Sequence, residues 1–389
     1  MNILHLLSWF PKPDDPTLGN FCIRMIDALP EDCHSVILSV CDGKDLCKSF
    51  EIKTIEGAHH THIQIQIRPP KNAILRKLKM FRMYEYGLRY IKKNYFNPDL
   101  IHLHVSYPLG RMALLWHKLY GYKYVLTEHW TIYQPQNKDV MQGTLKRNIL
   151  RIANHSSVIM PVSLDLQHCM EGHGVKNRFQ VIYNLVDTSV FRLGAPTDGS
   201  VKKRMLHIST LRDEAKNFSG ILRTIERLRQ QRDDFELHVI HDYEALEFKA
   251  FVKEHHLDDC VIFHGKKTSA EVAEAYAQCD FFVLFSNFEN LPCVLVEAFA
   301  SGVPVLTTDV GGIAEIVSSE RGILIHQGDE DALLRGMNQL LDTCNDYDRH
   351  AIRQYALQTF DSHIIGEQIH QEYSKAKNAS KQYITFYFG

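Results

Sequence analysis

The feature that most constrains the fold is an alternation of apolar runs of strand length with longer segments of helical period. This alternation occurs twice along the chain. Between the two passes lie residues 192–203, which contain Gly, Pro, Ser and Asp and show no periodicity. Alternating strands and helices are typical of α/β folds with parallel sheets. We therefore expect an α/β protein with two Rossmann-like, doubly wound domains facing a cleft, where such folds bind ligands.

The same reading predicts individual elements and domain bounds. Expected strands cover residues 3–7, 35–40, 100–103, 124–127, 157–162 and 180–183, and then 205–209, 235–240, 261–264, 281–285, 305–308 and 322–325. The expected domains are residues 1–191 and 204–360, joined by a linker at 192–203 and followed by a helix at 361–377 and a tail at 378–389. The tail is apolar at 383–388, and the sequence does not say what it packs against.

Composition excludes several classes of protein. The 389 residues carry 44 Lys and Arg against 46 Asp and Glu, a net charge of −2, so bulk charge gives no reason to expect a nucleic-acid partner. No apolar run is long enough to span a membrane, and residues 1–10 resemble a first strand more than a signal peptide. The nine cysteines are scattered and contain no C-x-x-C, which fits a reducing cytoplasm.

Two histidine or acidic motifs invite a metal interpretation. His102 and His104 lie on one face of an expected strand, but the sequence offers no third ligand beside them. Asp329 and Asp331 form a D-x-D, yet they directly precede a helical pattern, where an N-cap is the simpler role. We therefore expect no metal site and no cofactor.

Residues 68–93 form a strongly basic segment, with nine basic residues and one acid, Glu85. Ile74, Leu78, Phe81 and Leu88 recur in it at helical spacing. Two interpretations stay open. The segment is either an amphipathic helix that rests on an anionic membrane surface, or a solvated helix whose apolar stripe faces its own core.

The most informative segment covers residues 286–315. An expected strand ends at 285, a loop carries Glu289, and Pro292 falls at the start of a helix, where it is well tolerated. The backbone N–H groups of Asn290 and Leu291, together with the helix dipole, would form an anion site suited to a diphosphate. Glu297 follows Glu289 by eight residues, so the two carboxylates can contact hydroxyl groups on either side of a phosphate. Taken alone, they are equally well a loop glutamate and a helix glutamate.

The surroundings of this pair carry a resemblance. The E-x7-E of Glu289 and Glu297 is followed by AFASGVPV and then GGIAE, as in the retaining glycosyltransferases of family 4, which have the GT-B fold. Further segments resemble the family in the same order along about 350 residues: NLVD at 184–187, STLRDEAKN at 209–217, and His264-Gly265 ahead of Tyr276 and Asp280. The resemblance implies that the second domain binds a nucleotide sugar and that the final helix returns to the first, acceptor-side domain.

Carried over position by position, the resemblance implies roles for single residues. Glu289 would contact hydroxyls of the donor sugar, Glu297 the ribose, and Lys216 the phosphates. The backbone at Asn290, Leu291 and Pro292 would lie beside the sugar and diphosphate, and Gly265 beside the base. In the first domain, Gly19 would bring amides to the diphosphate, and His129 would bond the sugar near the reacting carbon.

The sequence departs from the family in three places. Asn290-Leu291-Pro292 stands where the family has Gly-aromatic-Gly, so donor preference is not transferred. The family's arginine aligns with Leu211, and Arg212 is the available cation. Leu185 replaces the glycine of N-G-V-D.

These observations lead to one expected function and several rivals. We expect a retaining, metal-independent hexosyltransferase that moves a sugar from a UDP- or GDP-sugar to a glycan, lipid-linked or other small acceptor. Surface polysaccharide or glycoconjugate synthesis is the expected process, and the cytoplasm or the inner face of the membrane the expected place. The alternatives are a two-lobed nucleotide-sugar-binding protein, or another GT-B enzyme such as an epimerase or phosphorylase. An inverting glycosidase using Glu289 and Glu297 fits less well, because it would leave the phosphate-binding features without a purpose.

Overall fold

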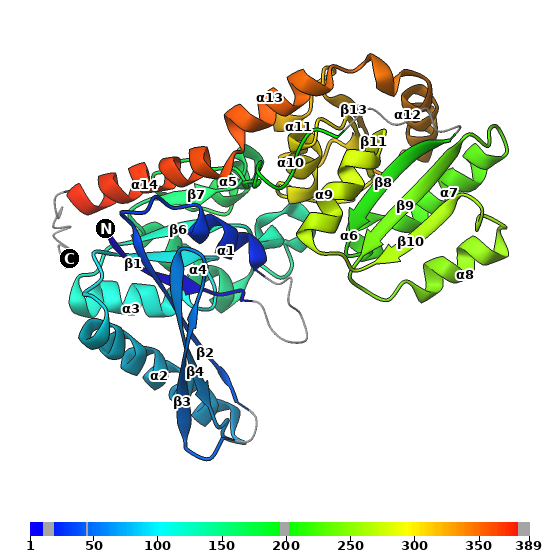
Figure 1. The fold of residues 1–389 in the computed structure, drawn as a ribbon. Coiled ribbons are helices and arrows are strands. Elements are labelled where there is room, and N and C mark those ends of the chain that lie inside the picture. The colour runs from blue at the N-terminus through cyan, green and yellow to red at the C-terminus, as the bar shows by residue number, and fades with distance from the viewer. Residues whose placement is uncertain (11–18, 44–45, 195–201, 380–389) are drawn as a thin grey trace. The chain divides into compact units, whose positions relative to one another are not determined.

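The computed structural model describes residues 1–10, 19–43, 46–194 and 202–379. The chain divides into two compact units. Unit 1 comprises residues 1–161 and 167–182 together with the C-terminal part from 366 onward, and unit 2 comprises 162–166 and 183–365. Figure 1 labels the helices and strands of both units.

Unit 1 is built on a seven-stranded sheet in the order β3-β4-β2-β1-β5-β6-β7. The strands are β1 (Asn2–Leu7), β2 (His34–Asp42), β3 (Phe50–Glu56), β4 (His60–Ile67), β5 (Leu100–His104), β6 (Tyr124–Glu128) and β7 (Ile159–Pro161). All neighbours are parallel except β3 and β4, which form a hairpin. The helices are α1 (Asn20–Asp27), α2 (Ala73–Asn94), α3 (Gly110–Tyr120), α4 (Gly143–His155) and α5 (Leu164–Gly172), of which α5 begins in unit 2.

Unit 2 contains a six-stranded, fully parallel sheet in the order β10-β9-β8-β11-β12-β13. Its strands are β8 (Lys203–Ser209), β9 (Phe235–His241), β10 (Val261–Gly265), β11 (Phe281–Leu284), β12 (Val305–Thr308) and β13 (Gly322–Ile325). Its helices are α6 (Asp213–Lys216), α7 (Phe218–Arg229), α8 (Leu246–Glu254), α9 (Ser269–Gln278), α10 (Cys293–Ala300), α11 (Ile313–Ile316), α12 (Glu330–Thr343) and α13 (Arg349–Thr359). Helix α14 (Ser362–Asn378) begins in unit 2 and continues in unit 1.

Burial explains why these residues form these elements. Every residue of β5, β6 and β11 is buried, as expected for parallel strands covered on both faces. In α7 the buried residues Phe218, Ile221, Leu222, Ile225 and Leu228 recur at the spacing of one helix face, and they pack into the core of unit 2. The expected α/β architecture with two parallel sheets is therefore confirmed.

The expected strands differ from the structure in two places. Residues 180–183 do not form a strand: only Phe179 makes an isolated bridge to Ile159, although Gln180 and Ile182 donate backbone hydrogen bonds to the carbonyls of Ile159 and Pro161. Residues 180–183 therefore lie beside β7 but do not pair with it as a regular strand. The β3–β4 hairpin is absent from the expected strands, because β3 is largely exposed and lacks a clear apolar alternation.

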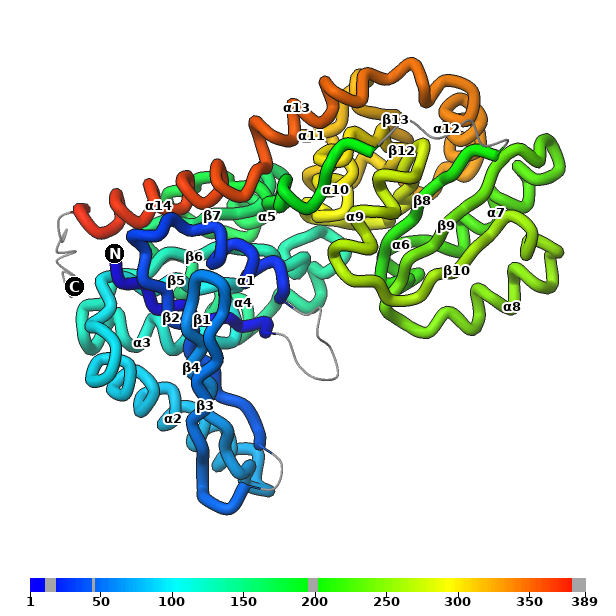
Figure 2. Tube along the Cα trace, viewed as in Figure 1, coloured from blue at the N-terminus to red at the C-terminus, as the bar shows by residue number. Residues whose placement is uncertain are grey.

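The units also divide the chain at other positions than the expected domains. Residues 183–191, expected in the first domain, lie in unit 2. Within the expected linker, 195–201 lie outside the described residues, as do 380–389 of the tail. Two contacts join α14 to other parts of unit 1 (Figure 2 traces α14 in red). The Tyr373 hydroxyl and His102 Nδ1 share a hydrogen bond of 2.6 Å, and Glu372 pairs with Arg178 at 2.5 Å.

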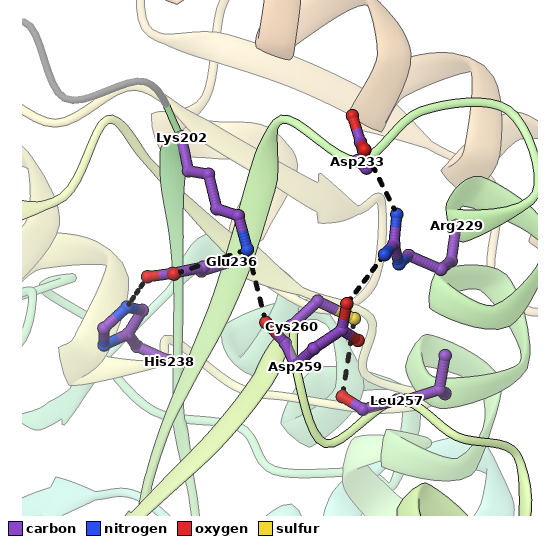
Figure 3. A network of polar contacts seen from close by, with 8 residues as sticks. All are labelled: Lys202, Arg229, Asp233, Glu236, His238, Leu257, Asp259 and Cys260. Atoms are coloured by element: carbon purple, nitrogen blue, oxygen red, sulfur yellow. Dashed lines mark hydrogen bonds and ion pairs between the residues drawn. The ribbon is translucent and has the colours of Figure 1, made fainter.

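A polar network joins the amino-terminal ends of β8, β9 and β10 in unit 2 (Figure 3). Arg229 at the end of α7 pairs with Asp259 at 2.7 Å, just before β10. Lys202 contacts the Asp259 carbonyl at 3.4 Å and pairs with Glu236 of β9 at 3.8 Å. These contacts connect the amino-terminal ends of the strands, and they lie at the opposite end of the sheet from its carboxyl-terminal edge.

Candidate functional site

The carboxyl-terminal edge of the unit 2 sheet contains a topological switch point. From β8 the chain proceeds outward through β9 and β10, and it then returns to place β11 on the other side of β8. Loops that follow two such neighbouring strands diverge and leave a crevice, which is where open α/β sheets bind ligands. Lys216 follows β8 and Glu289 follows β11, so the fold brings these two predicted residues to the same crevice.

Lys216 and Glu289 are in direct contact. The Lys216 ammonium donates a hydrogen bond to Glu289 Oε1, and the hydroxyl of Ser286 donates to the same oxygen at 2.7 Å. The Glu289 carboxylate is largely buried and the Lys216 side chain is partly buried. The pair thus places a cation and a hydrogen-bond acceptor side by side at the switch point.

The loop that carries Glu289 is fastened to its surroundings. Asn287 bonds α6 twice: its backbone N–H donates to the Ala215 carbonyl at 2.8 Å, and its side chain to the Glu214 carbonyl at 3.1 Å. Thr308 at the end of β12 donates to the Ser286 carbonyl at 2.7 Å. These bonds fix the loop that carries Glu289 relative to α6, which carries Lys216, independently of the contact between Lys216 and Glu289.

Two glycines let another loop approach the backbone of Glu289. Gly311 has φ +56, and a Cβ at this position would lie 2.0 Å from the Glu289 carbonyl oxygen. The N–H of Gly312 donates to the Asn290 carbonyl at 2.7 Å. Only a residue without a side chain permits such an approach. The GGIAE sequence therefore shapes the loop that carries Glu289.

Helix α10 begins directly after this loop. Pro292 is its N-cap, and Cys293 is its first helical residue, one position later than expected. Asn290 and Leu291 are buried, and the Leu291 carbonyl accepts a hydrogen bond from the Asn184 side chain at 2.7 Å. Glu297 lies buried in the second turn. The structure brings Asn290, Leu291 and Pro292 to the start of the helix, as the sequence predicts.

Arg212 lies at the same edge of the sheet but in a different environment. It is the N-cap of α6, and its guanidinium donates to the Tyr243 hydroxyl at 2.9 Å and lies 5.2 Å from the centre of that ring. Leu211 before it has φ 53, and its N–H donates to Ser209 Oγ at 3.0 Å. The left-handed residue turns the loop directly before Arg212. The Arg212 carbonyl accepts a hydrogen bond from the Lys216 N–H at 2.8 Å, whereas the contacts described for the Arg212 guanidinium are with Tyr243.

Gly265 ends β10 with φ +67, and a Cβ there would meet nothing within 4 Å. Glycine is therefore favoured at this position by the left-handed backbone conformation, and not by a lack of space for a side chain. The position lies two strands from the Lys216 loop on the same sheet edge.

In unit 1, His129 directly follows β6 and is buried. Its ring lies 4.4 Å from that of Phe21. Burial lowers the pKa of His129 to about 3, so the imidazole is neutral at neutral pH. A neutral imidazole can both donate and accept a hydrogen bond.

Glu128 is a functional candidate that sequence reasoning missed. Its Oε1 accepts the backbone N–H groups of His129 and Trp130 at 3.0 Å each, and its Oε2 accepts the N–H of Ser106 and the Tyr133 hydroxyl at 3.1 Å each. Burial raises the pKa of the Glu128 carboxyl, while these hydrogen bonds act in the opposite direction. This carboxylate fixes the turn that carries His129.

Gly19 serves a local packing requirement. It is the N-cap of α1 with φ 72, and a Cβ would lie 2.4 Å from the carbonyl oxygen of Trp9. The close approach is therefore to the chain's own backbone. Residues 11–18, which precede it, lie outside the described residues.

The expectation that His102 and His104 lack a third partner is wrong. His5 on the neighbouring strand β1 places Nδ1 3.3 Å from His104 Nε2. The three buried imidazoles could hold a metal ion by proximity, as could Cys22 with His104 and His129. His102, however, already bonds Tyr373 at 2.6 Å and Thr127 at 2.7 Å, and burial lowers its pKa well below the usual range. Only a long-range pairing of β1 with β5 reveals His5, and sequence spacing does not contain it.

The two D-x-D residues have structural partners at the start of α12. Asp329 is the N-cap of α12 and accepts the Ala332 N–H at 2.8 Å, and Asp331 pairs with Arg227 at 2.5 Å. In a second D-x-D sequence, Asp346 and Asp348, the second aspartate is the N-cap of α13 and accepts the N–H groups of His350 and Ala351 at 3.0 Å each.

Two family models match the chain. Residues 18–190 match "Glycosyltransferase Family 4", and residues 197–359 match "Glycosyl transferases group 1". The chain belongs to glycosyltransferase family 4. In this glycosyltransferase, Gly19 and His129 lie in the segment that matches the family 4 model. The segment that matches the group 1 model contains Arg212, Lys216, Gly265, Glu289 and Glu297.

Relatives of this glycosyltransferase share limited identity with it. It is 29% identical over 259 residues to N-acetyl-alpha-D-glucosaminyl L-malate synthase of Bacillus anthracis, covering 63% of this chain and 66% of that enzyme. It is 25% identical over 369 residues to the putative teichuronic acid biosynthesis glycosyltransferase TuaC of Bacillus subtilis, covering 87% of this chain and 89% of that protein.

Solved structures confirm the GT-B fold. Sucrose-phosphate synthase from Thermosynechococcus elongatus superimposes with a TM-score of 0.74 at 16% identity, covering 96% of this chain and 99% of that one. Anabaena HepE, solved in complex with UDP, gives a TM-score of 0.74 at 18% identity, covering 96% of this chain and 100% of that one. Within the described part of the glycosyltransferase, no helix is long and apolar enough to cross a membrane.

Proposed function

We propose that this glycosyltransferase is a retaining hexosyltransferase that takes its sugar from a UDP- or GDP-sugar. The observation that carries the proposal is the Lys216–Glu289 contact at the switch point, next to the start of α10. A lysine, a carboxylate and a helix N-terminus together suit a ligand that combines a diphosphate with hydroxyl groups.

Donor binding would exchange the partners of the pair. Lys216 would leave Glu289 and contact the diphosphate, whose charge competes with the carboxylate for the ammonium. Glu289 would then accept hydrogen bonds from the sugar hydroxyls, and Glu297 from those of the ribose. The N–H groups at the start of α10 would face the phosphates, where the helix dipole favours negative charge. Gly265 would border the base.

The same groups would assist the reaction. Breaking the bond between sugar and diphosphate leaves negative charge on the departing phosphate. Once the donor is bound, Lys216 and the amides of α10 would already contact the diphosphate before the bond breaks, and preorganised donors of this kind usually supply the largest catalytic term. We therefore propose that transfer needs no metal ion. Arg212 would add a second cation after release from Tyr243, and the neutral imidazole of His129 would hydrogen-bond the sugar.

For the acceptor we propose a glycan or lipid-linked molecule in surface polysaccharide or glycoconjugate synthesis, within the cytoplasm. The support is the name of the B. subtilis relative, which assigns that protein to teichuronic acid biosynthesis. Similarity at 25% identity supports this class of process and leaves the individual acceptor open.

The test is a turnover assay with a panel of UDP- and GDP-sugars and glycan acceptors, with and without EDTA. Nucleotide release should depend on one donor and survive EDTA, and NMR of the product should show the anomeric configuration of the donor. An inverted product would refute the retaining reaction, and activity restored only by Mn²⁺ would refute metal independence. Tight donor binding without nucleotide release on every acceptor would favour a binding protein instead.

A further inference from the structure

The first half of helix α2 exposes large apolar side chains. Ile74 is 71% exposed, Leu75 56%, Leu78 53% and Phe81 41%. Ile74, Leu78 and Phe81 follow the spacing i, i+4, i+7 and therefore share one helix face. This apolar face is made by residues 74, 75, 78 and 81.

The second half of α2 holds the helix on unit 1 through a different face. Tyr84, Gly87, Leu88 and Ile91 are buried there, and a Cβ at Gly87 would lie 2.5 Å from Leu38 of β2. Leu88, expected on the same stripe as Ile74, therefore belongs to the core. The first turns lie beside the β3–β4 hairpin (Figure 1), and there the apolar face stays uncovered by any described residue.

The charges around the apolar face fall into two groups. Arg76 pairs with Asp42, and Lys79 donates to the carbonyls of Ser49 at 3.0 Å and Arg68 at 2.9 Å. Lys71, Lys77 and Arg82 are exposed and make no hydrogen bond or ion pair within the described residues. The structure therefore separates basic residues that fasten the helix from basic residues that face outward.

The one acid of the segment does not balance these outward charges. Glu85 accepts hydrogen bonds from Trp116 Nε1 at 2.9 Å and from the Tyr120 hydroxyl at 2.7 Å, and it pairs with Arg89 at 3.4 Å. Its charge is thus directed to α3 and to Arg89, and it does not pair with Lys71, Lys77 or Arg82 in the described structure.

We propose that the apolar face of α2 docks on a lipid bilayer that contains anionic phospholipids, with Ile74, Leu78 and Phe81 at the acyl boundary and Lys71, Lys77 and Arg82 at the headgroups. Apolar side chains flanked by unpaired cations match this surface in both polarity and charge. A second copy of the chain fits less well, because it would bring the same cations together. Docking is independent of the donor site and of the proposed reaction.

The test is flotation of the full chain, without donor or acceptor, with neutral phosphatidylcholine vesicles and with vesicles containing phosphatidylglycerol. The wild-type protein should bind the anionic vesicles, bind the neutral ones much less, and dissociate as salt is raised. Lys77→Gln/Arg82→Gln should weaken binding about 25-fold, at about fivefold for each basic residue. Ile74→Ser/Leu78→Ser should weaken it at least about tenfold.

Matched variants control for general effects. Leu119→Ser/Leu246→Ser removes two other apolar side chains, 62% and 70% exposed, and Lys176→Gln/Lys253→Gln removes two other exposed lysines. Both should bind like the wild type, and circular dichroism should show all variants folded. Equal losses in control and test variants would overturn the proposal, as would equal binding to both kinds of vesicle.

Two further outcomes are decisive. Absence of vesicle binding together with a dimer that Ile74→Ser/Leu78→Ser abolishes in sedimentation would assign the apolar face to a second copy and overturn the proposal. Normal nucleotide release without vesicle binding would overturn the proposal and leave the proposed function intact, so the two fail separately.

Discussion

At the scale of single residues, Lys216 and Arg212 differ although both are cations on one sheet edge. Lys216 contacts Glu289, whereas Arg212 lies on Tyr243. We predict that Lys216→Ala lowers kcat about 10²- to 10³-fold, as loss of a preorganised donor does, and that Arg212→Ala lowers it less. Steady-state kinetics measures both. Lys267→Ala, which removes an exposed partner of Glu271 in the same unit, is the control. A larger effect for Arg212→Ala would contradict this assignment.

Glu128 tests how His129 is positioned. In Glu128→Gln one oxygen becomes an NH₂ group, so either the His129 and Trp130 N–H groups or the Ser106 N–H and Tyr133 hydroxyl lose their acceptor. An unsatisfied buried donor costs about 1–3 kcal/mol. We predict a lower melting temperature and a reduced kcat, whereas Glu31→Gln, an exposed change in the same unit, should alter neither. Calorimetry and kinetics measure the two effects, and unchanged values in both would remove the role given to Glu128.

The sequence reveals some of these residues and not others. Lys216, Glu289 and Glu297 are predictable because each lies in a short sequence motif that follows an expected strand or opens an expected helix. Glu128 carries no such pattern, since its donors come from the turn after β5 and from Tyr133 as well as from its neighbours. The contact of Lys216 with Glu289 likewise depends on the pairing of β8 with β11, which spacing does not show.

At the scale of elements, Gly311 connects the loop after β12 to the loop that carries Glu289. We predict that Gly311→Ala destabilises unit 2 and lowers kcat, because its Cβ would lie 2.0 Å from the Glu289 carbonyl oxygen. Gly328→Ala is a matched control, with φ +74 and nothing within 4 Å of its Cβ. It should cost only the strain of a left-handed alanine, about 1–2 kcal/mol. Urea unfolding and kinetics distinguish them, and equal losses for both would rule out the steric explanation.

Elements of unit 2 were more predictable than those of unit 1. Strands β12 and β13 coincide with their expected ranges, because each is a short apolar run bounded by polar or turn-forming residues. The β3–β4 hairpin was missed, since β3 is largely exposed and lacks a clear apolar alternation. The run at 180–183 resembles a strand in sequence, yet in the structure only Gln180 and Ile182 donate backbone hydrogen bonds to β7.

At the scale of the whole molecule, buried histidines link stability to pH. Burial lowers the pKa of His5 and His129 to about 3 and of His62 to about 4, and it lowers those of His102 and His104 well below 6.5. All five lie in unit 1. Below pH 6.5 the unfolded chain therefore binds more protons than the folded one, and the free energy of unfolding falls as the pH decreases.

We predict that unit 1 loses stability on acidification from pH 7 toward pH 4, by up to about 1.4 kcal/mol per pH unit for each of these histidines. In the described part of unit 2, burial lowers the pKa of His207 to about 4 and also lowers the pKa of the partly exposed His264. Hydrogen exchange at decreasing pH should show β1, β5 and β6 losing protection, corrected for intrinsic exchange rates, before β8 and β11. Protection that is independent of pH in both sheets would contradict the prediction.

The central claim is that the diphosphate of a nucleotide sugar binds at Lys216, Glu289 and the start of α10. Isothermal titration of UDP- and GDP-sugars tests it most directly, with the wild-type protein, Lys216→Ala and the Lys267→Ala control. A charged hydrogen bond is worth about 1.5–3 kcal/mol, so the account predicts that one donor binds the wild type and the control equally and Lys216→Ala about 10- to 100-fold more weakly. Equal affinity in all three proteins, or no binding of any nucleotide sugar to the wild type, would contradict it.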